Sequence, residues 1–435
     1  MIETDRLKFL PQKTFIIYIC FTYMLFIFGP IQYKFIGVKE VINSSIYITL
    51  FLIAANFAYN RGVAKNEARY KLALKLGNRR IKQLHIVNFS VIYSILLYIL
   101  LIIQNNNIHG TLSFGNFNYF SLMAETYTYI DYETTFSGWL LSYTAVFRII
   151  GVVGGVYYWD KSRGLFNALT CVLCCLIIVN NTFFVGSQKQ TIDLFIYILL
   201  ALVAKNVKNS KRIEIKTIIL VLSLIVAAII IMGLIINARV ELWEDKYNAV
   251  ASGMPQMSLL KSDNFFYKIL PKPILSAMIY LSGYFSQGYR GLALCLNEKF
   301  VPTWGMGFSF KVMNDFSRWF NIPLDLIERS YPVRMSHDYG ISAYSNWHSI
   351  FPWFASDVSF IGAIAVVSYF IYLWGRTWKE WIDTKNLWPL ILFSHLTILV
   401  LYIPCNNQLF QTRESIVATL FLLIFWAVFR GKLRT

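Results

Sequence analysis

The apolar residues of this chain fall in long continuous runs, unlike the short alternating or one-sided patterns of a soluble protein. The run from Thr217 to Asn237 is almost entirely apolar, and Leu165 to Gln188 contains no charged residue. About 20 apolar residues in a helix cross the ~30 Å hydrocarbon core of a bilayer. The runs predict ten transmembrane helices, near residues 14–30, 41–59, 84–103, 139–159, 165–185, 191–204, 217–237, 353–375, 388–404 and 414–430.

Only helices and closed barrels satisfy every backbone polar group inside a bilayer. These runs are too long and too continuously apolar for barrel strands, so the sequence predicts an all-α polytopic integral membrane protein. The composition agrees, because 57% of the residues are hydrophobic and 14% are charged, whereas a soluble domain has about 25% charged residues. We expect one membrane domain over residues 1–435, whose first helix is retained and not cleaved as a signal peptide.

Basic residues are concentrated in loops expected to face the cytoplasm. The loop Asn60–Lys82 contains eight basic residues and one acid, whereas Gln104–Gly138 has no Lys or Arg. By the positive-inside rule the first loop is cytoplasmic and the second is outside. A further cytoplasmic loop is expected at Arg376, Lys379 and Lys385. Both termini are therefore predicted in the cytoplasm, and the net charge of +17 is explained without nucleic-acid binding.

The longest connection between predicted spans, residues 238–352, is expected on the outer side and forms a loop subdomain. It contains an apolar segment, 274–296, that is interrupted by Gly283, Gln287, Gly288 and Arg290. If that segment crossed the membrane fully, the basic residues after the eighth span would lie outside, against the positive-inside rule. The sequence therefore favours a re-entrant or interfacial helix that shapes a cavity.

Ionisable residues within and at the ends of spans form the main functional signal, because each costs about 2.5–3.5 kcal/mol on insertion scales. Arg148 lies in mid-helix ahead of Gly151, Gly154 and Gly155, a spacing that favours close helix packing. It is either functional or part of a buried ion pair. The other charges gather near the outer boundary of the membrane, at Lys189, Asp193, Arg239, Asp357, Arg413 and Glu414.

Basic residues on the outer side run against the usual charge bias and fit an anionic ligand, because arginine grips phosphate oxygens bidentately. Structural alternatives remain for each of them. Lys189 pairs with Asp193 one helical turn away, or snorkels to the interface. Arg239 and Arg413 are otherwise interfacial anchors, and Asp357 is otherwise a packing carboxylate.

Other polar residues are further, weaker candidates for the functional site. In the long loop these are Arg290, His337, Trp347 and His348, and Asn407 and Gln408 lie in a polar hairpin before the last span. His395, alone within the ninth span, is expected to make a core polar contact. Cys171, Cys174 and Cys175 are interpreted as packing residues, because no histidine or base accompanies them. The acid pair Asp131 and Glu133 is too short and common a motif to define a metal site.

Several motifs resemble one known family. They are WHSIFPWFASDVSFIG from Trp347, YIPCNNQLFQTRES through Glu414, FFVGSQKQTIDLF around Lys189, INAR ending at Arg239, and YFSQGYRGLALCL followed by WGMGFS. Together they resemble the Wzy-type O-antigen polymerases and related oligosaccharide repeat-unit polymerases, over about the last 250 residues. Such enzymes are lipid-dependent glycosyltransferases of the bacterial inner membrane. Relatives often have a small hydroxyl residue where His348 stands, which weakens its case as a general base.

The resemblance implies a reaction at the periplasmic face between two undecaprenyl-pyrophosphate-linked oligosaccharides. An acceptor hydroxyl attacks the anomeric carbon of the donor and polyprenyl pyrophosphate leaves, with no cofactor and no metal. The residues that would contact the pyrophosphate are Arg239, Arg290, Arg413, Lys189 and Arg148. The proton acceptor would be Asp357, Glu414 or His348, and the glycan contacts would be Trp347, His337, Asn407 and Gln408. Membrane lipids and a polysaccharide chain-length regulator are the expected partners.

Two other functions remain open from the sequence. An O-antigen ligase uses the same donor and transfers the glycan to the lipid A core. A flippase or transporter of lipid-linked oligosaccharide would show internal repeats and a midplane site on broken helices. The sequence shows no internal repeat, and its charges cluster at one face beside a long loop. The polymerase is therefore the preferred prediction.

Overall fold

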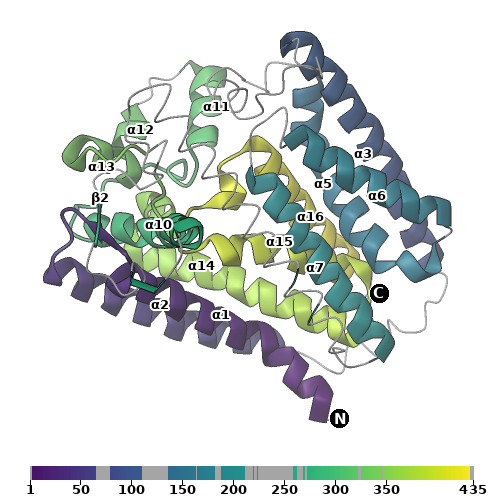
Figure 1. Cartoon of the computed structure of the whole chain (residues 1–435), viewed down its shortest axis with the longest axis horizontal. Helices are drawn as coiled ribbons and strands as arrows, with labels where there is room; N and C mark the ends of the chain where they lie inside the picture. Colours follow the sequence, from purple (N-terminus) through teal and green to yellow (C-terminus); the bar gives the residue numbers. More distant parts are fainter. Residues whose placement is uncertain are drawn as a thin grey trace.

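The computed structural model is a bundle of helices capped at one end by shorter helices (Figure 1). The residues that the structure describes are 2–64, 79–109, 136–162, 164–181, 188–210, 219, 223, 258–261, 268–269, 272–321, 325–343 and 346–431. Within them the only strands are β1 (Ile31–Tyr33) and β2 (Ser258–Leu260), which pair antiparallel with Ile31 opposite Leu260. The predicted helical class therefore agrees with the described part of the chain, apart from this short ribbon.

Within the described ranges, six helices are long and apolar enough to cross a membrane. They are α1 (Ile2–Phe28), α2 (Val38–Ala64), α3 (Arg79–His109), α5 (Phe136–Tyr157), α7 (Gln188–Ser210) and α14 (Ile350–Thr384). Two shorter apolar helices, α6 (Gly164–Val179) and α15 (Leu387–Tyr402), accompany them. The last helix is α16 (Arg413–Gly431). By length and hydropathy the chain is a multi-pass membrane protein; the finer count of ten spans stays a prediction, and the seventh predicted span, 217–237, lies outside the described ranges except for residues 219 and 223.

Helix α14 is longer than its predicted span of 353–375. Its 35 residues correspond to about 52 Å of helix at 1.5 Å per residue. Non-helical dihedral angles at Val358 and Ser359 divide it into a short first segment and a long second one. The expected basic loop at its end is wrong in part, because Arg376 and Lys379 are helical. They lie one turn before Glu380 and Asp383 and form ion pairs with them, which keeps these charged turns in the helix.

The interrupted apolar segment of the long loop forms one continuous helix, α10 (Lys272–Cys295). Gly288, expected at a polar break, instead permits a close contact. A Cβ at this position would lie 2.0 Å from the carbonyl oxygen of Pro404 and 2.6 Å from the amide nitrogen of Ser349. The glycine therefore lets α10 pack against Ser349, which precedes α14, and against Pro404, which follows α15. Whether α10 is re-entrant or interfacial stays a prediction.

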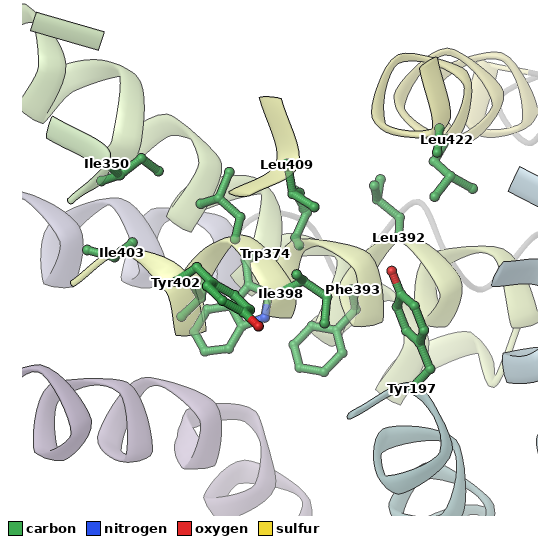
Figure 2. Packing of buried hydrophobic residues seen from close by; sticks show 14 of the residues in the cluster. Tyr197, Ile350, Trp374, Leu392, Phe393, Ile398, Tyr402, Ile403, Leu409 and Leu422 are labelled. Carbon is green, nitrogen blue, oxygen red and sulfur yellow. The ribbon is translucent and has the colours of Figure 1, made fainter. Parts of the chain in front are cut away.

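The bundle packs as two groups of helices joined through α15. Helices α1, α2, α10 and α14 contact one another, as do α3, α5, α6, α7 and α16. The predicted close approach at the α5 glycines is confirmed, because a Cβ at Gly154 would lie 2.5 Å from Val87 of α3 and one at Gly155 would lie 2.7 Å from Thr170 of α6. Figure 2 shows the buried side chains around α15, which is enclosed by residues of α7, α14 and α16.

Three short helices lie at one end of the bundle, in the upper left of Figure 1. They are α11 (Phe310–Phe320), α12 (Asp325–Arg329) and α13 (Tyr331–Tyr339). Helix α11 begins at Ser309, whose side chain accepts a hydrogen bond from the amide of Val312, and ends at Asn321 in the left-handed conformation. These helices belong to the predicted loop subdomain and bring its polar residues to the end of the bundle that carries the charged helix termini.

Candidate functional site

A cavity of about 270 Å³ lies between α5, α7, α15 and α16, and we call it the charged pocket. The predicted site residues that line it are Arg148, Lys189, Trp347, Gln408 and Glu414. Arg148 and Lys189 are predicted pyrophosphate contacts, Trp347 and Gln408 are predicted glycan contacts, and Glu414 is a predicted proton acceptor. Residues more than 200 positions apart in the sequence thus share one enclosed space. The structure brings this part of the predicted site together.

The charged side chains of the pocket form two ion pairs. Arg148 of α5 pairs with Glu414 of α16, and its Nη1 also donates to the hydroxyl of Tyr98 at 2.7 Å. Lys189 pairs with Asp193 one turn further along α7, at 3.1 Å. The expected pairing of Lys189 is therefore confirmed, and Arg148 has the buried ion pair that was one of its two interpretations. Among the described lining residues, two cations are balanced by two carboxylates.

Two helices begin at the pocket. Lys189 and Gln190 lie in the first turn of α7, and Thr412 and Glu414 lie at the start of α16. A helix N-terminus carries a partial positive charge and unsatisfied amide groups, so it favours anions. Arg148, in the middle of α5, meets these ends because α5 extends past them. The N-termini of α7 and α16 therefore contribute partial positive charge to the pocket, whereas the charged side chains that line it balance one another.

A hydrogen-bonded chain forms one wall of the pocket. The hydroxyl of Tyr197 and Nδ1 of His395 lie 2.9 Å apart, and Nε2 of His395 lies 2.9 Å from the hydroxyl of Thr419. Both nitrogens of His395 are thus used, which confirms the predicted core polar contact. Sequence reasoning missed Tyr197. Its spacing gives the signal, because Lys189, Asp193 and Tyr197 recur every four residues and share one face of α7.

Arg413 lies beside the pocket in a group that we call the rim cluster. Its Nε and Nη2 donate to the two oxygens of Asp315 on α11, at 3.0 and 2.7 Å. Lys311 lies 3.4 Å from the same carboxylate, and Arg413 also lies over the ring of Tyr143 at 6.0 Å. Among the described residues, Arg413 and Lys311 share the Asp315 carboxylate next to Glu414 and Thr412. Asp315 was not recognised from the sequence, where it is one of many charges in a polar segment.

Arg290 and His348 form a separate buried group. Arg290 is 0% exposed, its Nη2 donates to Asn346 at 3.4 Å, and its guanidinium lies 5.0 Å from the ring of Tyr33. His348 packs against Gly291, where a Cβ would lie 2.9 Å from its Nδ1. Burial, with the nearby charge of Arg290, lowers the pKa of His348 to about 3. Neither residue lines the charged pocket as the described residues define it.

The low pKa of His348 predicts a loss of stability in acid. An unfolded histidine has a pKa of about 6.5. Because the folded pKa is lower, the unfolded chain binds more protons, and stability falls as the pH drops from about 6.5 toward 3. Each pH unit in this window costs about 1.4 kcal/mol. Between about pH 7 and pH 5, the drop in melting temperature of the purified protein should therefore be smaller in His348→Gln than in wild type. Exposed His337→Gln serves as the control and should keep the wild-type drop.

Asp357 holds a loop. Its Oδ1 accepts hydrogen bonds from the Thr303 hydroxyl at 2.5 Å and from the amides of Gly305 and Gly307 at 2.9 Å, and its Oδ2 accepts from the amide of Phe308 at 2.9 Å. Asp357 is the last residue of the first segment of α14, immediately before the break at Val358. Both oxygens are thus engaged with residues 303–308, and Asp357 does not line the charged pocket as the described residues define it.

We expect Asp357→Asn to loosen this loop. The amide would place a donor where backbone amides now point, and a hydrogen bond to a charged group contributes about 1.5–3 kcal/mol. The variant should lose about 3 kcal/mol of stability and become sensitive to protease within 303–308. Melting in detergent and limited proteolysis measure both effects. Asp338→Asn, which changes an exposed carboxylate on α13, is the control; equal behaviour of the two variants would contradict the anchoring role.

The remaining predicted residues lie in different surroundings. Asn407 is buried and its Nδ2 donates to the carbonyl of Phe308 at 2.9 Å, whereas His337 is exposed and pairs with Glu328 at 2.8 Å. Neither lines the charged pocket as described. Arg239, Asp131 and Glu133 lie outside the described residues. Cys171 and Cys175 are exposed on α6, and the described residues contain no group of three or more potential metal ligands.

The charged pocket can hold an anion by exchanging its internal ion pairs for contacts with a ligand, and it offers an aromatic side chain and amides beside them. Comparisons of this chain with protein-family models, curated proteins and solved structures find no match. The described part of the chain defines a class of protein. It is a multi-pass helical membrane protein with a buried, charge-paired pocket. The resemblance to repeat-unit polymerases stays a hypothesis beside it.

Proposed function

We propose that this chain is a lipid-dependent glycosyltransferase that polymerises polyprenyl-pyrophosphate-linked oligosaccharide repeat units into a surface polysaccharide. One observation carries the proposal. Five residues selected from the sequence as contacts for a diphosphate, a glycan or a proton line a single pocket: Arg148, Lys189, Trp347, Gln408 and Glu414. Residues that were scattered interfacial anchors would have no reason to converge, so their convergence supports a common ligand.

The pocket suits a diphosphate next to a sugar. Arg148 offers a planar fork of donors and Lys189 a mobile ammonium, and the N-termini of α7 and α16 add partial positive charge. Two further cations, Arg413 and Lys311 of the rim cluster, lie beside them and contact Asp315. Trp347 offers an aromatic face and Gln408 an amide, the groups with which proteins hold sugar rings and hydroxyls.

The reaction that fits this pocket is displacement at an anomeric carbon. The diphosphate of the donor takes Arg148 and Lys189 from their carboxylates, and these cations stabilise the charge that develops as the diphosphate leaves. Such stabilisation is usually the largest catalytic contribution, and the loss of one donor costs about 3 kcal/mol. A pocket carboxylate freed by the exchange takes up the proton of the attacking hydroxyl.

The proposal includes an orientation. The charged pocket faces the periplasm of a bacterial inner membrane, both termini are cytoplasmic, and the polyprenyl tail of the donor lies along the bundle in the lipid. Residues 238–352 then form the periplasmic loop subdomain, with α11 next to the pocket through the contact of Asp315 with Arg413. A polysaccharide chain-length regulator is the expected protein partner.

The test supplies purified protein in lipid nanodiscs with a defined polyprenyl-pyrophosphate repeat unit as both donor and acceptor. A ladder of products that differ by one repeat unit is expected on gels and by mass spectrometry. A parallel reaction offers lipid A core as the acceptor. Transfer only to the core would assign a ligase, and transfer to neither acceptor, with transport of the lipid-linked unit across vesicles, would assign a flippase.

A further inference from the structure

Four carboxylates are candidates for taking up a proton near the charged pocket, and their oxygens differ in what they contact. Both oxygens of Asp357 accept bonds from the 303–308 loop. Both oxygens of Asp315 accept from Arg413. Glu414 holds Arg148 through Oε1. Asp357 and Asp315 therefore serve the fold or the rim cluster, which leaves Glu414 and Asp193.

Asp193 has an oxygen that the fold does not use. Its Oδ2 lies 3.1 Å from Nζ of Lys189, whereas Oδ1 is buried and has no hydrogen-bond partner among the described residues. The residue is 9% exposed and lines the charged pocket. A buried carboxylate oxygen without a donor costs free energy. In a native structure such a group calls for an explanation, and a functional site is one.

A diphosphate in the pocket would release the other oxygen as well. Lys189 has a flexible stem and three donors, so it can move from Asp193 to a phosphate oxygen. The terminal torsion of an aspartate is broad and twofold, so rotation about it turns either oxygen toward the cavity. Asp193 then presents a carboxylate to whatever hydroxyl lies beside the diphosphate. Glu414 differs from Asp193 in its surroundings. The hydrogen bond from Arg148 to the Tyr98 hydroxyl keeps the guanidinium next to the Glu414 carboxylate.

We propose that Asp193 accepts the proton of the attacking sugar hydroxyl, an assignment that rests on the proposed polymerase function. The hydroxyl oxygen bonds to the anomeric carbon of the donor as the bond from that carbon to the diphosphate oxygen breaks. The leaving diphosphate keeps the bonding electron pair, and Lys189 and Arg148 contact it. The hydroxyl proton passes to a carboxylate oxygen of Asp193 and then to water. Glu414 is a positioning residue that places Arg148 in the pocket before the diphosphate takes it.

The experiment compares Asp193→Asn, Glu414→Gln and Asp383→Asn in the purified polymerisation assay. Asp383 provides the matched control, because it pairs with Lys379 at 2.7 Å with the same four-residue spacing, near the end of α14 and away from the pocket. We expect Asp193→Asn to lower kcat by about 100-fold or more, the contribution of a general base. Its donor KM and its dissociation constant for undecaprenyl pyrophosphate should not rise, because Lys189 no longer has to leave a carboxylate, and Asp383→Asn should retain the wild-type kcat.

Three results would overturn the assignment alone. They are a kcat for Asp193→Asn within about tenfold of wild type, a loss that appears entirely in the donor KM, and a larger loss of kcat in Glu414→Gln than in Asp193→Asn. A role limited to neutralising Lys189 would tighten undecaprenyl-pyrophosphate binding in Asp193→Asn and leave kcat near wild type. A wild-type protein that makes no polymer from either acceptor would instead overturn the proposed function, and this assignment with it.

Discussion

Replacing Arg148 by Met and Glu414 by Gln in the same chain is expected to leave a folded, membrane-inserted protein that makes no long polysaccharide. The single change Arg148→Met would strand the Glu414 carboxylate inside the pocket, and breaking a buried pair costs about 3–5 kcal/mol. The double variant removes both charges and so avoids that cost. Its kcat/KM should still fall by at least about 100-fold, because the diphosphate has lost a fork of donors that act in the transition state.

The double variant separates catalysis from stability. If Arg148 served only the fold, removing both partners would restore activity along with the melting temperature. Melting in detergent and the yield of inserted protein measure the fold, and the product ladder measures turnover. Arg61→Met is the control, since it changes an exposed arginine at the end of α2. A double variant with wild-type ladders would remove Arg148 from the proposed mechanism.

Arg413→Ala is expected to give the second large effect, a loss of long polysaccharide with little change in the fold. Without Arg413, Asp315 keeps Lys311 at 3.4 Å, so no unpaired carboxylate is created at this half-buried site. The rim cluster loses one of its two cations, and the barrier to diphosphate departure rises by about 3 kcal/mol, or about 100-fold in rate. In cells that make O antigen through this protein, the lipopolysaccharide should then carry a single repeat unit per core.

The matched control for this variant is Arg318→Ala. Arg318 lies on the same short helix as Asp315 but is exposed, so it tests whether any positive charge at this end of the bundle suffices. Equal ladders from Arg413→Ala, Arg318→Ala and wild type would show that the rim cluster has no part in the reaction. The same assay tests Arg239→Ala. Arg239 is a diphosphate contact predicted from the sequence alone.

Several members of the charged pocket were foreseeable, and so was the pairing of Lys189 with Asp193, but the pairing of Arg148 with Glu414 was not. Arg148, Lys189 and Glu414 stand out because charge is rare in apolar segments and costly there. Tyr197 could also have been found, from its place on the Lys189 face of α7. Asp315 could not, because charges are ordinary in a polar segment and its contact with Arg413 joins residues 98 positions apart.

The differences in the fold have a similar cause. Hydropathy ends α14 near residue 375, but Arg376 and Lys379 stay helical because each has a carboxylate one turn further on. Asp357 looks like a charge buried one turn into a span; the break at Val358 places it instead at a segment end, facing a loop about 50 residues earlier in the chain. Pairing within a turn is readable from spacing, whereas loop contacts over such separations are not.

The cancellation of charge inside the pocket has a consequence for selectivity. A soluble anion such as free phosphate must break two internal pairs to enter, and no membrane anchor keeps it at the opening. A lipid-anchored ligand is confined to the membrane plane, which raises its effective concentration at the opening and makes its headgroup the stronger competitor. Under the proposed function, the matched side chains would thus favour tethered diphosphates over the dissolved phosphate of the surrounding medium.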